Sequence, residues 1–348
     1  MLTVLSVAYS LTPVGPDAVG GAEQVLSALD EALVAAGHRS VVVACEGSSV
    51  MGELVATPAA PSGTIGDAER QSAQAATREA MEDVLRREPV DVVHMHGLDF
   101  AACLPPPGPP VLATLHLPPS WYPREAFMPS RSDTWLQCVS MSQHTGCPRG
   151  PGLLPPIANG VAVERLSGAT HAKRDFAVML ARICPEKGVH LALEAAHTGG
   201  VPLRIGGEVF PYPEHQAYFA ELVRPRLDNR RRFIGPVGFA RKRRLLTAAR
   251  CLLVPSLAPE TSSLVAMEAL ACGTPVIAFP AGALAEIVEH ERTGFLVRDA
   301  DEMAAAIARV ETIDPGACRA AARARFSRAR MVDAYLARYA ALAARAAA

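Results

Sequence analysis

Residues 251–278 read CLLVPSLAPETSSLVAMEALACGTPVIA: a short apolar run, a helical segment and a second short apolar run. Apolar runs that alternate with helical segments are typical of parallel strands joined by helices. The same alternation continues on both sides of this stretch. It predicts an α/β fold made of βα units around parallel sheets.

The pattern predicts eleven strands, and the alternation between them predicts helices. The strands are Leu2–Val7, Ser40–Ala44, Val90–Met95, Val111–Leu115, Trp135–Ser140, Phe176–Leu180, Leu203–Ile205, Arg232–Ile234, Cys251–Val254, Val276–Ala278 and Phe295–Val297. Helices are expected at 21–36 and 68–87, and residues 56–66 are expected to form a loop. The last helix, Arg328–Arg345, carries a stripe at helical spacing that needs a surface to cover. That stripe is Met331, Tyr335, Leu336, Tyr339 and Leu342.

A length of 348 residues suggests two domains. The Pro- and Gly-rich stretch at 148–168 is the expected boundary, which gives an N-terminal domain over 1–162, a C-terminal domain over 163–325 and a terminal helical segment over 326–348. Two successive parallel-sheet domains would form a cleft at the carboxyl ends of their strands, where ligands bind to open α/β sheets.

Composition excludes several classes of protein. The formal net charge of -1 gives no general case for binding nucleic acid or an anionic membrane. No apolar run reaches the ~20 residues of a membrane-spanning helix, and the N-terminus has no basic segment before its apolar run, so it is interpreted as a strand rather than a signal peptide. The eight cysteines are scattered without a C-x-x-C pair. We therefore expect a reduced, cytoplasmic protein.

Glu260 and Glu268 are the strongest functional signal. Glu260 is expected in the loop between a buried strand and the next helix, and Glu268 well into that helix. On a continuous helix their spacing would place both acids on roughly one face. The helix would begin near Ser262–Val265, where free backbone N–H groups can bind an anion. Carboxylates accept hydrogen bonds from sugar hydroxyls, and backbone amides bind phosphates. The combination therefore suits a sugar linked to a diphosphate. A helix cap at Glu260 and a solvated Glu268 are the structural alternative.

Two cations follow another predicted strand. Arg182 and Lys187 lie at the carboxyl end of 176–180, where they could neutralise a pyrophosphate that gains charge as it leaves. Lys187 is one of only three lysines, which favours a specific role over a solvated turn. Gly20 and Gly21 precede the first helix and would let the backbone approach a ligand. They do not form G-x-G-x-x-G, and no acid follows at the ribose position of a nicotinamide enzyme.

Histidines and aromatic residues mark the N-terminal half. His94 and His96 share one strand face and His116 ends the next strand. Hydrogen-bonded histidines are favoured over a metal site, because no companion carboxylate or cysteine has suitable spacing. Trp121 and Tyr122 follow within a Pro-rich loop, and they would either stack on an acceptor or pack the loop. A basic run is interpreted as a solvated helix and turn rather than a membrane patch. It comprises Arg224, Arg226, Arg230, Arg231, Arg232, Arg241, Lys242, Arg243 and Arg244.

Taken together, these motifs resemble glycosyltransferase family 4, which has the GT-B fold of two Rossmann-like domains facing a cleft. The matches run in order along nearly the whole chain. They are Gly20–Glu23, Asp91–His96, Thr114–His116, Val139–Ser140, Ile157–Val161, Arg182 with Glu186–Gly188, Phe233–Gly235, Pro255–Ser256, Glu260 to Val276, Glu286–Val288 and Thr293–Val297. The segment from Glu260 to Val276 is the specific one.

The resemblance implies a retaining hexosyltransferase that uses a nucleoside-diphosphate sugar and no catalytic metal or other cofactor. UDP is preferred over GDP or ADP, and the acceptor would be a sugar, a small molecule or a lipid-linked hydroxyl, with at most peripheral membrane contact. Glu268 would hold the ribose and Val237 would lie near the base. Glu260 would contact the transferred sugar and His116 would lie beside its anomeric centre. The diphosphate would be bound by Arg182, Lys187 and amides of Gly21 and of 263–265. The final helix would pack back on the N-terminal domain.

The chain also departs from the family pattern. Thr-Ser-Ser follows Glu260 where relatives often carry glycine, and Gly282-Ala283 stands where Gly-Gly is common. Two other functions remain open at this stage: a nucleotide-sugar 2-epimerase on the same fold, and an inactive nucleotide-sugar-binding subunit. Donor hydrolysis, epimer formation and binding without turnover would distinguish the three.

Overall fold

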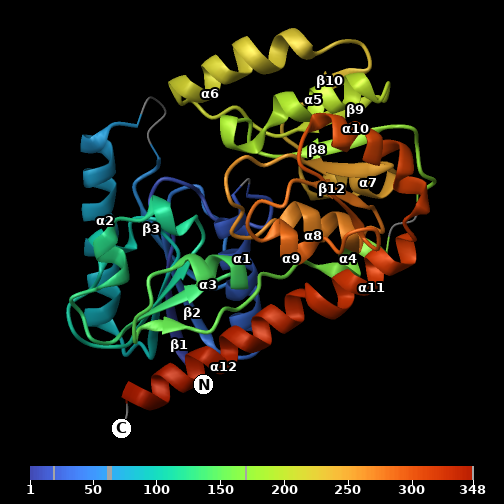
Figure 1. Cartoon of the computed structure of the whole chain (residues 1–348). Helices are drawn as coiled ribbons and strands as arrows, with labels where there is room; N and C mark the ends of the chain where they lie inside the picture. Colours follow the sequence, from blue (N-terminus) through green and yellow to red (C-terminus); the bar gives the residue numbers. More distant parts are fainter. Residues whose placement is uncertain (19, 61–64, 169–170, 347–348) are drawn as a thin grey trace. The chain divides into compact units, whose positions relative to one another are not determined.

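The computed structural model describes residues 1–18, 20–60, 65–168 and 171–346 (Figure 1). Part of the predicted loop, 61–64, and the end of the predicted terminal segment, 347–348, lie outside the described residues. The chain forms two compact units, which are described separately. One is Met1–Asn159 with Ala329–Ala348 and the other is Gly160–Arg328.

The N-terminal unit contains a seven-stranded sheet in the order β3-β2-β1-β4-β5-β6-β7, and every neighbouring pair is parallel. Its strands are β1 Thr3–Val7, β2 Arg39–Cys45, β3 Glu53–Thr57, β4 Val92–Met95, β5 Val111–Leu115, β6 Thr134–Cys138 and β7 Leu153–Leu154. Its helices are α1 Gly21–Ala35, α2 Asp67–Arg87, α3 Met141–Gly146 and α12 Arg328–Ala346.

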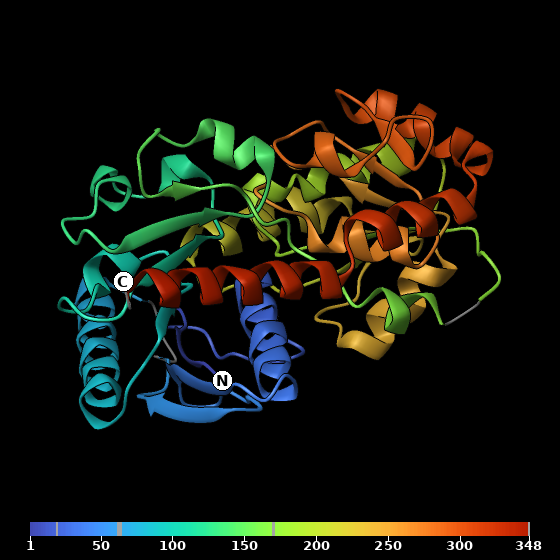
Figure 2. The ribbon, with the colours of Figure 1, turned by 90° about the horizontal axis from the view of Figure 1, so that it is seen from below.

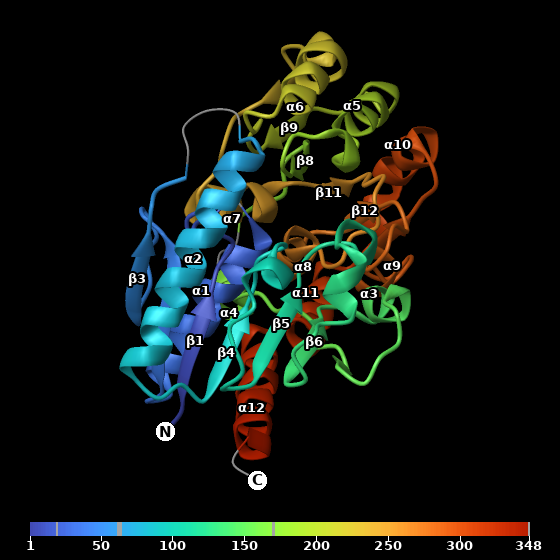
Figure 3. The ribbon, with the colours of Figure 1, turned by 90° about the vertical axis from the view of Figure 1, so that its left-hand side faces the viewer.

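Both faces of this sheet are covered by helices. Leu5 and Val7 of β1 share a core with Met81 of α2, which lies on the viewer's side of the strands in Figure 3. On the opposite face, Val42 of β2 packs with Leu26 of α1. Successive side chains of a strand point to opposite faces of the sheet. Because helices cover both faces, the side chains on either face of the central strands are buried.

The C-terminal helix α12, red in Figure 2, belongs to this unit through most of its length. Its buried side chains are Met331, Tyr335, Tyr339 and Leu342, four of the five residues of the predicted stripe. The two tyrosine hydroxyls make hydrogen bonds with residues of β4 and β5. The sheet is therefore the surface that the stripe covers.

The C-terminal unit contains a six-stranded parallel sheet in the order β10-β9-β8-β11-β12-β13. Its strands are β8 Ala177–Leu180, β9 Leu203–Gly206, β10 Arg231–Phe233, β11 Cys251–Val254, β12 Val276–Ala278 and β13 Gly294–Leu296. Its helices are α4 Val163–Ser167, α5 Val189–Thr198, α6 Pro213–Tyr218, α7 Phe239–Ala248, α8 Leu264–Ala271, α9 Leu284–Ile287, α10 Ala300–Arg309 and α11 Pro315–Arg325.

All eleven predicted strands are present with ends that shift by two residues or fewer, so the predicted α/β class with two parallel sheets is confirmed. Two strands were not predicted. β3 is an edge strand whose side chains are mostly half-buried or exposed, and its apolar run is only Leu54–Ala56. Its last two residues were wrongly assigned to the loop. β7 has two residues and lies in the Pro- and Gly-rich stretch.

In both units the order of strands reverses beside the first strand, as in Rossmann sheets. The reversal lies between β1 and β4 in the N-terminal unit and between β8 and β11 in the C-terminal unit. Loops that leave the carboxyl ends of those strands diverge and leave room for a ligand. Among the helices of the described ranges, none combines the length and the apolar character that crossing a bilayer requires.

Candidate functional site

Two loops meet at the strand reversal of the C-terminal unit. The loop after β8 carries Arg182 and Lys187, and the loop after β11 carries Glu260. The N–H of Leu257 donates a 2.8 Å hydrogen bond to the carbonyl of Glu186, which joins the loops. Gly188 adopts φ +61°, and a Cβ there would lie 2.1 Å from the carbonyl oxygen of Pro255. Only glycine permits this approach, so the packing of the loops requires the glycine of the Glu186-Lys187-Gly188 motif.

Lys187 and Glu260 form an ion pair across this junction. Lys187 Nζ lies 2.5 Å from Glu260 Oε1, and the Ser256 hydroxyl donates to the same oxygen. The side chains retain 27% and 11% exposure, so the pair is partly buried but still accessible. Both bonds use Oε1, which leaves Oε2 to accept a hydrogen bond from a ligand hydroxyl. The structure thus brings together one predicted cation and one predicted acid.

The backbone of Glu260 is held by a neighbouring turn. Its carbonyl accepts a 2.7 Å bond from Ala283 N–H, and its N–H donates to Ala281. Gly282 between them has φ +62°, and a Cβ there would lie 2.3 Å from the Glu260 oxygen. Ala283 has φ -64°, which any residue adopts. The turn therefore needs glycine at its first position alone, and the second glycine that is common in relatives is not required here.

Helix α8 begins at Leu264, after Ser263. Glu260 therefore lies in the strand-to-helix loop and Glu268 within the helix, as the sequence indicates, so the one-face spacing of a continuous helix does not apply. The amides of Ser263, Leu264 and Val265 open the helix, so they have no carbonyl one turn earlier, and Ser263 makes no side-chain cap. Ser263 has φ -117°, so its position does not demand glycine. These amides are suited to bind an anion.

Glu268 lies inside α8 and is almost fully buried. Burial raises the pKa of its carboxyl, and the opposing influence is Lys242 of α7, whose Nζ lies 2.5 Å from Glu268 Oε1. Glu268 is therefore not the solvated acid of the structural alternative. Within the described residues, the hydrogen bonds to this carboxylate and to that of Glu260 use Oε1.

Lys242 was missed by sequence reasoning, which assigned it to a solvated basic run. That interpretation is wrong for Lys242 and for Arg231, which is buried with an ion pair to Asp228. A signal for Lys242 was present, because it is one of only three lysines in an arginine-rich chain. The same rarity had already drawn attention to Lys187.

Arg182 and Val237 complete the predicted donor residues of this unit. The Arg182 guanidinium lies 5.7 Å from the centre of the Phe210 ring, and it forms no ion pair within the described ranges. It is thus available to an anionic ligand. Val237 follows β10 and lies beside Gly206, where a Cβ would approach its side chain to 3.3 Å. Val237 is accordingly at the carboxyl end of β9, next to the end of β8.

In the N-terminal unit, Gly20 and Gly21 start helix α1 after β1, at the strand reversal. A Cβ on Gly20 would meet the carboxylate of Glu23, which folds back over the start of the helix. Tyr122 is buried, and its hydroxyl accepts the N–H groups of His116 and Leu117 at 2.9 and 3.3 Å. Trp121 keeps 42% exposure. Of the predicted aromatic pair, Trp121 presents a surface and Tyr122 supports the loop.

The three predicted histidines form a hydrogen-bonded chain. His94 Nδ1 lies 3.2 Å from His96 Nε2, and His96 Nδ1 lies 3.0 Å from His116 Nε2. Burial holds the pKa of His94 and His96 well below the usual range and lowers that of His116 to about 4. All three are neutral at physiological pH. His116, at the carboxyl end of β5, is the most exposed of them.

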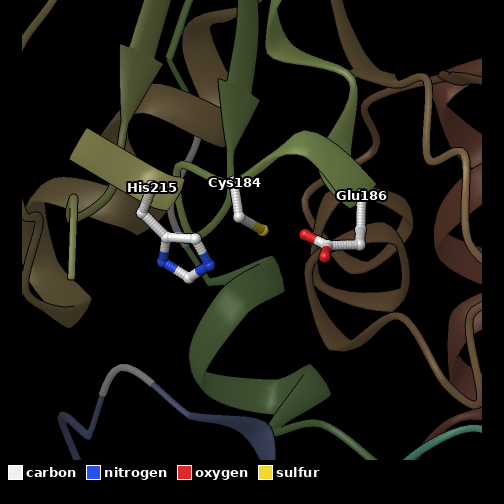
Figure 4. A group of neighbouring side chains, drawn as sticks. All are labelled: Cys184, Glu186 and His215. Carbon is white, nitrogen blue, oxygen red and sulfur yellow. The ribbon is translucent and has the colours of Figure 1, made fainter. Parts of the chain in front are cut away.

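One group of side chains in the described residues could hold a metal ion. Cys184, Glu186 and His215 place ligand atoms within 4.8 Å of one another. In Figure 4 the thiol of Cys184 lies between the imidazole of His215 and the carboxylate of Glu186. Arg182 is close enough to lower the pKa of both His215 and Glu186, and its charge disfavours a cation. The absence of a catalytic metal stays a prediction.

Two family models match the chain. The model described as "Glycosyltransferase Family 4" matches residues 19–145, and the model described as "Glycosyl transferases group 1" matches 174–312. Glycogen synthase of Mycobacterium tuberculosis is 33% identical over 225 residues, which are 60% of this chain and 51% of the relative. The match therefore spans about half the length of that curated relative.

Solved structures cover the chain more completely. AviGT4, a glycosyltransferase involved in avilamycin A biosynthesis, is 26% identical with a TM-score of 0.72, covering 99% of this chain and 98% of its own. Alr3699/HepE from Anabaena, in complex with UDP and glucose, has a TM-score of 0.75 at 19% identity, covering 98% and 100%. At that identity the second likeness concerns the fold alone, which is GT-B in both cases.

Proposed function

Because the chain belongs to glycosyltransferase family 4, we propose that it transfers a hexose from a nucleoside-diphosphate sugar to a hydroxyl acceptor with retention of anomeric configuration. The observation that carries the proposal is the Lys187–Glu260 ion pair at the strand reversal, next to the open amides of α8. It combines a cation for a diphosphate, an acid for a sugar hydroxyl and an anion-binding helix terminus.

Charge stabilisation is the main chemical task of such a site. As the bond between the anomeric carbon and the diphosphate breaks, negative charge grows on the leaving phosphate. Arg182, Lys187 and the amides of 263–265 are proposed to stabilise it. The acceptor oxygen attacks the anomeric carbon from the same face, and its proton passes to a leaving phosphate oxygen. The step needs no protein nucleophile and no metal.

The two acids are proposed to orient the donor. Glu268 would accept hydrogen bonds from the ribose hydroxyls through Oε2. Lys242 donates to its Oε1 and favours the ionised carboxylate. Glu260 would accept a hydrogen bond from a hydroxyl of the transferred sugar. UDP is the proposed nucleotide, and the complex of the Anabaena relative with UDP supports it. A carbohydrate or another small hydroxyl compound is the proposed acceptor.

A donor panel tests the proposal. The protein is incubated with UDP-, GDP- and ADP-hexoses without acceptor, and the products are analysed by NMR. We expect thermal stabilisation by one nucleotide series and slow release of free hexose, initially as the α-anomer from an α-linked donor. A C2 epimer would show an isomerase instead, and stabilisation without turnover would show a binding subunit. If no nucleotide sugar stabilises the chain, the proposal fails.

A further inference from the structure

A hydrogen-bonded chain runs from helix α12 to the carboxyl end of β5. Tyr339 Oη of α12 lies 2.7 Å from His94 Nδ1, and the two histidine contacts continue from there through His96 to His116. A branch joins His94 Nε2 to Thr114 Oγ1 at 2.7 Å, and Thr114 to Tyr335 Oη at 3.2 Å. All these residues belong to the N-terminal unit.

The proton positions in this chain can be assigned from its end. Tyr339 is fully buried, and burial raises the pKa of its phenol well above 10, so it keeps its proton. Within the part of the chain that the structure describes, His94 Nδ1 is its one hydrogen-bonding partner. A buried hydroxyl is costly unless it donates, so His94 Nδ1 accepts. Neutral His94 then carries its proton on Nε2 and donates it to Thr114.

The proton position on His94 determines those on His96 and His116, because each hydrogen bond between two of these residues needs one donor. His96 Nε2 also faces His94 Nδ1, at the longer distance of 3.2 Å, and shares the one lone pair of that nitrogen with the Tyr339 hydroxyl. Two facing lone pairs would repel each other, so His96 donates through Nε2. Nδ1 of His96 is then unprotonated and accepts, so His116 must donate to it through Nε2. His116 is consequently left with an unprotonated Nδ1. The opposite set of tautomers would leave the Tyr339 proton without an acceptor.

We propose that Tyr339, His94 and His96 are positioning residues that hold His116 in its Nε2–H tautomer, with Nδ1 as a hydrogen-bond acceptor for a substrate hydroxyl. The second half of this statement rests on the proposed function and on the expectation, from the family resemblance, that His116 lies beside the transferred sugar. An accepting nitrogen selects a hydroxyl rather than a phosphate oxygen, since a phosphate has no proton to donate. Helix α12 thereby takes part in substrate recognition through a residue 245 positions from His94.

The tautomers can be observed directly without any ligand. Long-range proton–nitrogen NMR of the full chain, labelled with nitrogen-15 histidine, separates protonated from unprotonated ring nitrogens. Signals are assigned by His94→Gln, His96→Gln and His116→Gln. We expect three neutral histidines, each protonated at Nε2. A wild-type His116 protonated at Nδ1 would overturn the proposal.

A pair of variants on α12 tests the role of Tyr339. Tyr339→Phe removes the hydroxyl that makes His94 Nδ1 an acceptor, and we expect an Nδ1–H population at His116. Tyr335→Phe is the matched control, because its hydroxyl contacts Thr114 and not a histidine. It should keep the wild-type tautomers. Wild-type tautomers in Tyr339→Phe, or the same change in both variants, would overturn the assignment to Tyr339.

Activity is measured separately, so that the two parts can fail independently. With UDP-glucose as the probe, Tyr339→Phe should hydrolyse the donor up to about tenfold more slowly than Tyr335→Phe, which is the worth of one hydrogen bond. Changed tautomers with unchanged hydrolysis would refute the sugar contact of His116 and leave the positioning intact. Absence of hydrolysis in the wild-type chain would count against the proposed function alone.

Discussion

Replacing Lys242 by Met removes the cation that compensates the buried Glu268. The Lys242 and Glu268 side chains are 15% and 7% exposed, so the carboxylate cannot turn to water for compensation. Breaking a buried ion pair from one side costs about 3–5 kcal/mol. Because Lys242 keeps some exposure, we expect the lower end, about 3 kcal/mol of unfolding free energy. Donor affinity should fall as well, since an unpaired Glu268 takes up a proton more readily.

The loss of unfolding free energy in Lys242→Met should depend on pH, and the sign of this dependence follows from the pKa of Glu268. The pKa of Glu268 is raised in the folded chain, and without Lys242 it rises further. The folded state then binds a proton more tightly than the unfolded state, so stability increases as the pH falls toward and below the folded pKa. The deficit of Lys242→Met relative to the wild type should therefore shrink as the pH is lowered toward the raised pKa of Glu268.

Urea denaturation followed by circular dichroism measures the effect. Tryptophan fluorescence serves as an internal reference, because Trp121 and Trp135 both lie in the N-terminal unit. Arg241→Met, an exposed change on the same helix, is the control and should cost little. The double variant with Glu268→Gln should regain most of the stability but not the donor affinity, since no buried charge remains unpaired. Equal losses in Arg241→Met and Lys242→Met would refute the reasoning.

Three further predictions concern Lys187, His116 and the expected absence of a catalytic metal. Lys187→Ala should lower kcat for transfer by roughly a hundredfold or more through lost charge stabilisation, with donor binding less affected; wild-type turnover would remove Lys187 from the mechanism. His116 has a pKa lowered to about 4, against about 6.5 when unfolded, so the unfolded chain binds more protons between these values and stability falls with the pH. The wild type should thus lose up to about 2 kcal/mol more than His116→Gln between about pH 7 and about pH 5, by tryptophan fluorescence; parallel losses would contradict the shift. Dialysis against EDTA should leave donor hydrolysis unchanged, and a loss restored by Zn²⁺ would direct attention to Cys184.

Local pattern was sufficient for most of the fold. Apolar runs separated by helical segments predicted eleven strands and the C-terminal helix, because periodicity reflects which face of an element is buried. The predictions failed where burial gives no pattern: β3 is a half-exposed edge strand and β7 has two residues. The Glu260 and Lys187 motifs could be found for a related reason. Each follows a strand directly, and in a parallel sheet the carboxyl ends share one edge.

Partnership between residues was decided by the tertiary structure. The sequence by itself determined that Glu268 lies in a helix, that Lys242 is a rare lysine and that His94 lies on a strand. Only the folded chain pairs Lys242 with Glu268 and sets Tyr339 against His94. The reason is physical: a helix or strand follows from neighbours along the chain, whereas the protonation of a buried group follows from whatever the packing places beside it.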